Sequence, residues 1–218
     1  MPEPVTIIGI GAGILGLMGH LARRYFDLAK EVLDIVLGFL LLVVALPLLA
    51  ICALIIKLSS RGPVIFTQTR VGKDGRPFRM YKLRTMHRDA ESATGAVWAR
   101  AGDPRVIRAC GWMRRSHVDE LPQLVNVING TMSLIGPRPE RPEILAELEK
   151  VYPDVRKRLK VRPGITGLAQ VRNGYDTSVE AFRHKLAADL EYIERQNWTT
   201  EFRILASTVT KLNDHTAH

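Results

Sequence analysis

An adjacent pair of carboxylates, Asp119 and Glu120, is the strongest candidate for chemistry in this sequence of 218 residues. Arg114 and Arg115 precede the pair, and Arg138 follows it. A carboxylate can attack phosphorus to give an aspartyl phosphate, and a diphosphate substrate then needs cations that neutralise its charge. Mg²⁺ binds one or two carboxylates together with phosphate oxygens, so Asp119 and Glu120 are also the expected metal ligands. The pattern predicts phosphoryl transfer.

A purely structural role for the two acids is the alternative. They stand directly before Leu-Pro-Gln-Leu, and Pro122 suits the first turn of a helix, so the acids could simply cap that helix. The surrounding cations, which include Lys82 and Arg141, are too many for a cap. The rigid loop Gly136–Pro139 also presents an arginine. These neighbours favour the chemical interpretation, in which the start of a helix near Asp119 also favours an anionic substrate.

The cysteines and histidines do not indicate a second catalytic or metal-binding centre. Cys52 and Cys110 form no C-x-x-C pair, so we expect both to be packing residues. His87 and His117 stand alone in the sequence, and we expect structural roles for them. The N-terminal residues MPEPVTIIG lack the basic region of a secretory signal, so we expect no export of the mature domain.

A membrane segment is predicted at Ile35–Ile56, which is 22 residues long and contains no charge. As a helix it would be about 33 Å long, close to the roughly 30 Å of a bilayer core. A buried helix of a soluble protein is the alternative, but the segment is apolar on every face. Pro47 lies in its middle and removes one backbone N–H, which predicts a kink.

Basic residues flank both ends of this segment: Arg23, Arg24 and Lys30 before it, Lys57, Arg61 and Arg70 after it. A simple span would place one of the two groups on the wrong side under the positive-inside rule. A helix that bends at Pro47 and returns to the same face satisfies both groups. The sequence therefore favours a re-entrant, proline-broken membrane helix.

The net charge of +9 is concentrated directly after this helix. Lys57–Arg115 holds 14 of the Lys and Arg residues against four acids. Such a block implies an anionic partner, which could be lipid headgroups, nucleic acid or a phosphorylated substrate. Aromatic residues for base stacking are sparse in the block, so we expect no nucleic acid.

An apolar, glycine-rich stretch at Val5–Ala22 contains a literal G-x-G-x-x-G, from Gly11 to Gly16. A dinucleotide site would also need a following second strand that ends in an acid. Glu31 and Asp34 lie near the required distance, but no second strand precedes them. A glycine-rich membrane helix is the better interpretation.

Short β-prone runs at Pro63–Gln68 and Phe78–Lys82 flank the turn Gly72–Gly75 and predict a hairpin. Elsewhere, apolar residues recur at helical spacing. The helical stretches expected from this spacing are Glu143–Leu159, Val179–Ile193 and Phe202–Leu212. The expected fold is mainly α with a small β-hairpin, divided into an N-terminal apolar segment (1–30), the membrane helix (31–57) and a catalytic domain with C-terminal amphipathic helices (58–218).

Four motifs in order carry a family resemblance: KLRTM at 82–86, Asp119-Glu120 with LPQL, MSLIGPRP at 132–139 and RPGITGLAQV at 162–171. Together they resemble the bacterial sugar transferases, or monotopic phosphoglycosyl transferases, and in particular their small members. The resemblance runs from about Arg23 to Val171. It implies a monotopic protein of the bacterial inner membrane with its catalytic domain on the cytoplasmic face.

The resemblance also implies a reaction. Asp119 would attack the β-phosphorus of a UDP-sugar and release UMP, with Mg²⁺ bound beside it. Polyprenyl (undecaprenyl) phosphate would then accept the sugar phosphate from the enzyme, and Glu120 would bind metal or activate the acceptor. Cations of the shared motifs are expected to bind substrate: Lys82, Arg84, Arg114, Arg138 and Arg162.

A competing class is a non-catalytic, membrane-tethered basic protein that binds lipid or nucleic acid. It explains the anchor and the charge. It gives no reason for Asp-Glu, GPRP and RPGITG to occur in this order. The enzyme is therefore the stronger hypothesis, and homodimerisation is left open.

Overall fold

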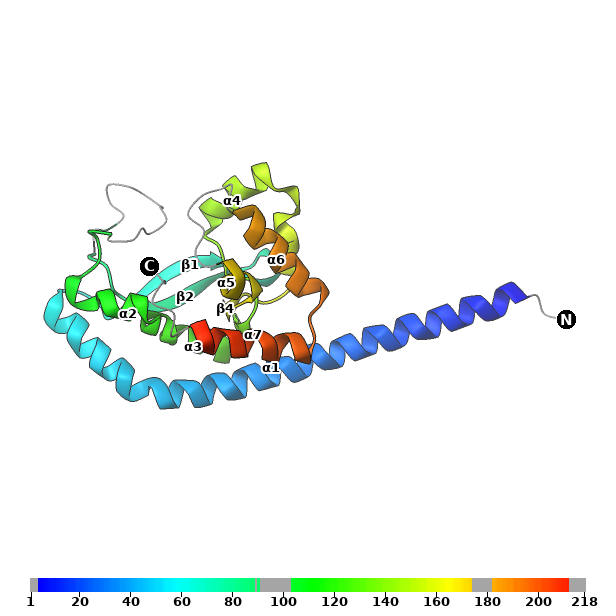
Figure 1. Cartoon of the computed structure of the whole chain (residues 1–218), viewed down its shortest axis with the longest axis horizontal. Helices are drawn as coiled ribbons and strands as arrows, with labels where there is room; N and C mark the ends of the chain where they lie inside the picture. Colours follow the sequence, from blue (N-terminus) through cyan, green and yellow to red (C-terminus); the bar gives the residue numbers. More distant parts are fainter. Residues whose placement is uncertain (1–3, 89, 91–102, 174–181, 212–218) are drawn as a thin grey trace.

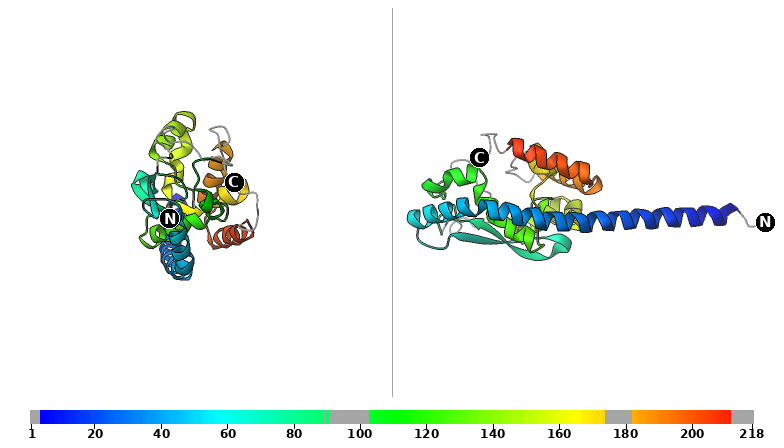
Figure 2. Two further views of the ribbon diagram at one scale, coloured as in Figure 1. Left: turned by 90° about the vertical axis from the view of Figure 1, so that its left-hand side faces the viewer. Right: turned by 90° about the horizontal axis from the view of Figure 1, so that it is seen from below.

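One long helix organises the molecule. The computed structural model describes residues 4–88, 90, 103–173 and 182–211, and helix α1 (Pro4–Ser59) takes up 56 of them (Figure 1). Its N-terminal part projects beyond the other elements, and its C-terminal part runs alongside them (Figure 1). The right-hand view of Figure 2 shows α1 between the hairpin of β1 (Ile65–Val71) and β2 (Pro77–Leu83) on one side and α7 (Trp198–Lys211) on the other.

Helix α1 confirms the predicted apolar segment. Among the described residues, Leu17–Ser59 is the one helix long and apolar enough to cross a membrane, with a mean hydropathy of 3.2 in its most apolar window. Only 17% of that window is buried within the chain. The residues Val5–Ala22 belong to the same helix. The dinucleotide alternative therefore fails, because the glycines follow a helix and not a strand.

Pro47 lies inside α1 without dividing it. Figure 1 shows the helix axis bending in its last, light-blue to cyan turns. The structure thus contains one bent helix, and the assignment of Pro47 as the point that breaks it stays a prediction. The return of α1 to the same membrane face stays a prediction, as does the division at residues 30 and 57.

The predicted hairpin is confirmed. Strands β1 (Ile65–Val71) and β2 (Pro77–Leu83) are antiparallel, and the pairing runs from Ile65 opposite Leu83 to Val71 opposite Pro77. The chain reverses through the 3₁₀ turn η1 (Lys73–Gly75), where Asp74 and Gly75 have φ values of 56° and 78°. Both strands are longer than the apolar runs that indicated them.

The predicted helical stretch Glu143–Leu159 is divided. Helix α4 (Pro142–Val151) ends before Pro153, and the chain continues as the 3₁₀ helix η4 (Pro153–Lys160). A residue before proline avoids the α conformation, and Tyr152 is extended with φ −124° and ψ 90°. The other two stretches are confirmed as α6 (Phe182–Glu194) and α7 (Trp198–Lys211), while Val179 and Leu212 lie outside the described residues.

A second sheet was not predicted. Strands β3 (Ser133–Ile135) and β4 (Gly164–Thr166) are parallel and pair Ser133 with Gly164 and Ile135 with Thr166. Each has three residues, which is too short for an alternating pattern to show in a sequence. Strand β3 leads directly into the loop that carries Arg138.

Short helices, among them η3 (Val118–Gln123) and α3 (Leu124–Ile128), pack against α1 and against strand β2. Helix α3 packs closely along α1. As expected for packing residues, Cys52 and Cys110 are buried in one apolar cluster that joins the end of α1 to α2. The remaining elements are η2 (Arg108–Cys110), α2 (Gly111–Arg115) and α5 (Leu168–Asn173).

Candidate active site

The two candidate carboxylates lie side by side in the 3₁₀ helix η3 and are both buried. His117 turns the chain from α2 into η3 with a left-handed φ of 55°, a conformation rare for residues other than glycine. The sequence suggested an α-helix start at this point. The α-helix that follows, α3, has five residues, so a helix dipole contributes less at Asp119 than we expected.

Glu120 is held by two cations from different elements. Arg138 donates from Nη1 to Oε2 at 3.0 Å and from Nη2 to Oε1 at 2.6 Å, which is a bidentate contact. Lys82 of β2 donates to Oε1 at 2.8 Å. Burial opposes ionisation of Glu120, but the charges and hydrogen bonds of Arg138 and Lys82 outweigh it and hold its pKa well below the usual range. Glu120 is therefore a carboxylate that orders two cations.

Asp119 has the opposite environment. Its side chain is buried, yet within the described parts of the chain no hydrogen bond or ion pair engages its carboxylate. Burial, reinforced by the charge of Glu120, raises the pKa of Asp119 to about 6, against the opposing charges of Lys82, Arg114 and Arg138. A carboxylate with this pKa is ionised near neutral pH and is not tied to a neighbour. These are the properties of a nucleophile or a ligand.

The loop that carries Arg138 is tightly packed. A Cβ added at Gly136 would lie 2.4 Å from the carbonyl oxygen of Arg162, so this position accepts only glycine. Gly136 donates its N–H to Thr166 of β4 at 2.9 Å. The loop is thus held against β4 along the whole strand, and this rigidity fixes the position of the Arg138 backbone.

Two arginines that the sequence did not indicate hold the same loop, and of these Arg158 is buried and Arg70 is partly buried. Arg158 donates from Nη2 to the carbonyl of Arg138 at 2.8 Å, and Arg70 donates from Nη1 to the carbonyl of Pro139 at 3.1 Å. Burial lowers the pKa of Arg70 to about 10, and it remains a cation at neutral pH. Both arginines lie far from the loop in sequence, which is why motif reading did not find them.

Arg158 belongs to a larger buried ionic group. Its Nε donates to Asp189 of α6 at 2.7 Å, and its Nη1 lies 3.8 Å from Glu140. Lys185 of α6 pairs with Glu140 in turn. We call these residues the support cluster: Glu140, Arg158, Lys185 and Asp189.

Arg114 lies where the sequence suggested. It lies in the last turn of α2, it donates from Nη1 to Thr85 Oγ1 at 3.4 Å, and its charge opposes the rise in the pKa of Asp119. Arg114 therefore joins the site. We call the assembled residues the dyad cluster: Lys82, Arg114, Asp119, Glu120 and Arg138.

Arg84 has contacts of a different kind. It is buried and donates to the carbonyls of Ser60 and Arg61 at 2.8 and 2.6 Å, which caps the end of α1. Gly62, with φ 125°, leaves room for it, because a Cβ there would lie 2.5 Å from Arg84 Nη1. These contacts favour an anchoring role over the substrate contact that we expected.

Arg162 is also engaged away from the dyad. Its Nη2 donates to Glu31 of α1 at 2.7 Å. Of the five cations expected at the substrate, the structure thus gathers Lys82, Arg114 and Arg138 around the carboxylates and uses the other two as ties to α1.

Comparison with known proteins gives a match over the part of the chain that contains these residues. A family model described as "Bacterial sugar transferase" matches residues 25–215, which is most of the chain. The chain belongs to the bacterial sugar transferase family. As a member it is an enzyme, a phosphoglycosyl transferase, and the alternative of a non-catalytic binding protein is set aside. The family and the long apolar helix α1 together make it a membrane protein.

Two of the three relatives described next are named as undecaprenyl-phosphate sugar-phosphate transferases. The chain is 44% identical over 196 residues to the UDP-glucose:undecaprenyl-phosphate glucose-1-phosphate transferase of Caulobacter vibrioides, covering 89% of this chain and 73% of the relative. It is 39% identical to the exopolysaccharide production protein PSS of Rhizobium leguminosarum, with 83% and 92% covered. It is 41% identical to the UDP-N-acetylgalactosamine-undecaprenyl-phosphate N-acetylgalactosaminephosphotransferase of Aeromonas hydrophila, where 83% of this chain covers 42% of the longer relative.

The side chains around the dyad could hold a divalent cation in one arrangement, with Asp119 as the protein ligand. Among the described residues no group of three or more His, Cys, Asp or Glu side chains is arranged to hold a metal ion. Both oxygens of Glu120 are occupied by Lys82 and Arg138, which leaves Asp119 as the available carboxylate. The residues therefore fit a magnesium site in which most ligands come from substrate phosphate and water.

Proposed function

We propose that this bacterial sugar transferase moves a sugar 1-phosphate from a UDP-sugar to polyprenyl phosphate. The products are polyprenyl-diphosphate-sugar and UMP. The reaction is the one named for the Caulobacter relative, with the sugar left unassigned. It would be the first membrane step of a bacterial glycoconjugate pathway.

The observation that supports the mechanism is the buried carboxylate of Asp119, which no described residue pairs with and which lies beside three cations. In the first half-reaction an oxygen of Asp119 attacks the β-phosphorus of the donor. The bond between that phosphorus and the bridging oxygen breaks, and UMP leaves with the electron pair. The result is an aspartyl phosphosugar.

In the second half-reaction an oxygen of polyprenyl phosphate attacks the same phosphorus. The acyl phosphate bond breaks, and Asp119 is released as a carboxylate. Donor and acceptor therefore need not be bound at the same time, which predicts ping-pong kinetics.

The other residues of the dyad cluster stabilise the negative charge of the reacting phosphates. Glu120 orders Lys82 and Arg138 beside Asp119, and Arg114 approaches from α2. Charge develops on the transferring phosphoryl group and the leaving phosphate, and preorganised cations stabilise it. Because Glu120 is paired with both cations, a small movement of either one would also free it to help activate the acceptor.

Mg²⁺ is the cation that we assign to this site. Asp119 would supply a carboxylate oxygen to it, and the diphosphate would supply the others. When bound, the metal neutralises charge on the diphosphate. Glu120 would join as a ligand only by giving up one of its contacts with Lys82 or Arg138.

The location we propose is the bacterial inner membrane, with the catalytic domain on the cytoplasmic face. Basic residues flank the apolar part of α1 at both ends, and Lys57–Arg115 is strongly basic. A re-entrant path for α1 places both groups on the cytoplasmic side, in accord with the positive-inside rule.

The proposed function is tested with purified, detergent-solubilised protein, polyprenyl phosphate and a panel of UDP-sugars. We expect UMP release with at least one donor and a lipid-linked sugar product. Chelation of divalent cations should stop turnover, and added Mg²⁺ should restore it. Release of UDP in place of UMP would contradict the proposal, because it would mean cleavage at the sugar carbon rather than at phosphorus.

A further inference from the structure

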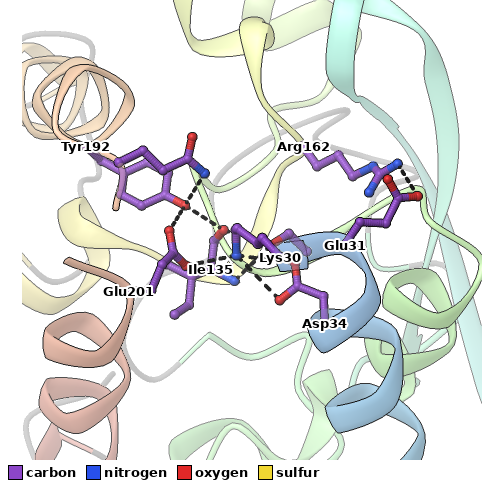
Figure 3. Close-up of polar contacts among 9 residues, drawn as sticks. Lys30, Glu31, Asp34, Ile135, Arg162, Tyr192 and Glu201 are labelled. Carbon is purple, nitrogen blue, oxygen red and sulfur yellow. Dashed lines mark hydrogen bonds and ion pairs between the residues drawn. The ribbon is translucent and has the colours of Figure 1, made fainter. Parts of the chain in front are cut away.

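Charged residues on one turn of α1 contact three separate elements of the catalytic domain (Figure 3). Lys30 faces α7, Asp34 faces β3, and Glu31 faces the residue that precedes β4 by two positions. We call these residues and their partners the α1 clasp: Lys30, Glu31, Asp34, Ser133, Arg162 and Glu201.

The centre of the clasp is buried and ionic. Lys30 Nζ lies 2.8 Å from Glu201 Oε2 and 3.2 Å from Asp34 Oδ2, and these three side chains are exposed by only 10%, 7% and 11%. The contact with Glu201 is an ion pair outside hydrogen-bond geometry, since Oε2 accepts no hydrogen bond. Desolvation offsets much of the attraction in such pairs, and apolar replacements are often at least as stable. Stability alone therefore does not account for the clasp.

Two hydroxyl groups connect this centre to β3. Ser133 donates from Oγ to Asp34 Oδ2 at 2.6 Å. The hydroxyl of Tyr192 lies 2.7 Å from Glu201 Oε1 and 3.0 Å from the carbonyl oxygen of Ile135 (Figure 3). Both ends of a three-residue strand are thus tied to the charges that α1 and α7 share.

Strand β3 ends where the active-site loop begins. Ile135 is followed by Gly136, whose close packing leaves the loop little freedom, and Arg138 comes two residues later. A continuous series of short contacts therefore joins α1 to the arginine that holds Glu120 in a bidentate contact.

We propose that the α1 clasp positions Arg138 for the reaction, by fixing β3 against the membrane helix. This inference rests on the proposed function, in which Arg138 serves the phosphoryl transfer. Misplacement of a catalytic group by about 1 Å through a distant change can reduce a rate by about 10²-fold. The seating of α1 in the membrane thereby controls the geometry of the phosphate site.

The test is a double-mutant cycle on the rate of UMP release in a single turnover. Ser133→Ala removes the contact with Asp34, and we expect it to slow release about tenfold in the wild-type background. In the Arg138→Ala background the same substitution should cost less than about twofold, because the group that it positions is already gone. KM for the donor should change less than kcat in the single variant.

Tyr192→Phe is a second test of the same proposal. It removes the hydroxyl that contacts the Ile135 carbonyl of β3 and keeps the aromatic ring. It should show the same dependence on background, and it carries the test if Ser133→Ala does not fold. Thr200→Val is the matched control: it removes a hydroxyl bond to the Arg195 carbonyl on the exposed side of α7, with no tie to β3. Its rate should stay within about twofold of wild type.

Equal slowing by Ser133→Ala in both backgrounds, with thermal midpoints that show folded protein, would overturn the positioning role and leave a general structural one. An unchanged rate in Ser133→Ala and in Tyr192→Phe would overturn it as well. A full rate in Arg138→Ala alone would instead contradict the proposed phosphate site, so the two failures are distinguishable.

Discussion

The dyad cluster and the support cluster are both buried groups of charges, but they differ in pairing. In the support cluster Arg158 is bonded to Asp189 at 2.7 Å and Lys185 is paired with Glu140. In the dyad cluster Asp119 is buried without a hydrogen bond or ion pair to the described residues. The paired charges of the support cluster stabilise one arrangement of its side chains. A buried carboxylate left unpaired is costly, and that cost is a mark of a group kept ready to react.

One carboxylate from each cluster, Asp119 of the dyad cluster and Glu140 of the support cluster, shows pKa shifts in opposite directions. Burial raises the pKa of Asp119 to about 6. Burial acts on Glu140 too, but Lys185 and Arg158 outweigh it and lower its pKa to about 2. The difference therefore lies in the cations that touch each carboxylate, and not in its depth in the protein.

Asp119→Asn should have the largest effect. It keeps the shape of the side chain but removes the attacking oxygen, so UMP release should fall by about 10³-fold or more. Single-turnover release with donor alone measures this. Glu120→Gln should also impair the reaction, because a neutral side chain binds Lys82 and Arg138 less strongly and positions them less well. An Asp119→Asn enzyme near the wild-type rate would mean that the unpaired carboxylate has no chemical role.

Arg138→Ala and Arg114→Ala should each reduce turnover by about 10²-fold, the scale of losing one charge contact in the transition state. Both proteins should still fractionate with membranes, because α1 is unchanged. Arg84→Ala is the contrasting variant: it should lose stability by uncapping α1 while kcat of the folded fraction is kept. If Arg84→Ala loses turnover as Arg138→Ala does at full thermal stability, Arg84 belongs to the phosphate site after all.

The pH dependence should follow Asp119. The nucleophile must be ionised, so the rate of UMP release should fall about tenfold per pH unit below a pKa of about 6. Release rates between pH 4.5 and 8 provide the check. A midpoint near the ordinary carboxyl pKa would show that burial does not perturb the reacting group.

The smallest effects should be on stability, with opposite signs for Asp119 and Glu140. The pKa of Asp119 rises on folding, so its ionisation costs stability as pH rises from about 4 to about 6, and Asp119→Asn should be more stable than wild type at pH 7.5. The pKa of Glu140 falls on folding, so its stabilisation is present above about pH 4.5 and is lost as pH falls toward 2. Glu140→Gln should therefore be less stable at pH 7.5.

Each of these changes should be about 1–3 kcal/mol, measured as shifts of the thermal midpoint in one detergent. Shifts of the same sign would remove the contrast between the clusters. A destabilised Asp119→Asn protein in particular would show that its carboxylate has a stabilising partner at neutral pH.

Local patterns predicted much of this molecule. The 22 uncharged residues Ile35–Ile56 indicated the membrane helix, and short motifs indicated the dyad with Lys82, Arg114 and Arg138. The hairpin was predicted because both strands are adjacent and joined by a glycine turn. The membrane helix and the hairpin depend on residues close together in sequence, whereas the cations beside the dyad were indicated by their motifs although Lys82 is 38 residues from Glu120.

Features that depend on distant contacts were not predicted. Arg158 and Asp189 are 31 residues apart and meet only because α6 folds back onto η4. A motif shows that an arginine is present but not which way it faces, so it did not indicate that Arg84 bonds the residues that follow α1 or that Arg162 bonds Glu31 of α1.

The most direct test of the central claim is intact-protein mass spectrometry after mixing the solubilised enzyme with UDP-sugar alone. The account predicts an added sugar phosphate that peptide mapping places on Asp119, UMP in equal amount, and loss of the adduct when polyprenyl phosphate is added. Asp119→Asn should give neither adduct nor UMP. No adduct on a wild-type enzyme that turns over with both substrates and gives intersecting kinetic lines would contradict the account and indicate direct transfer.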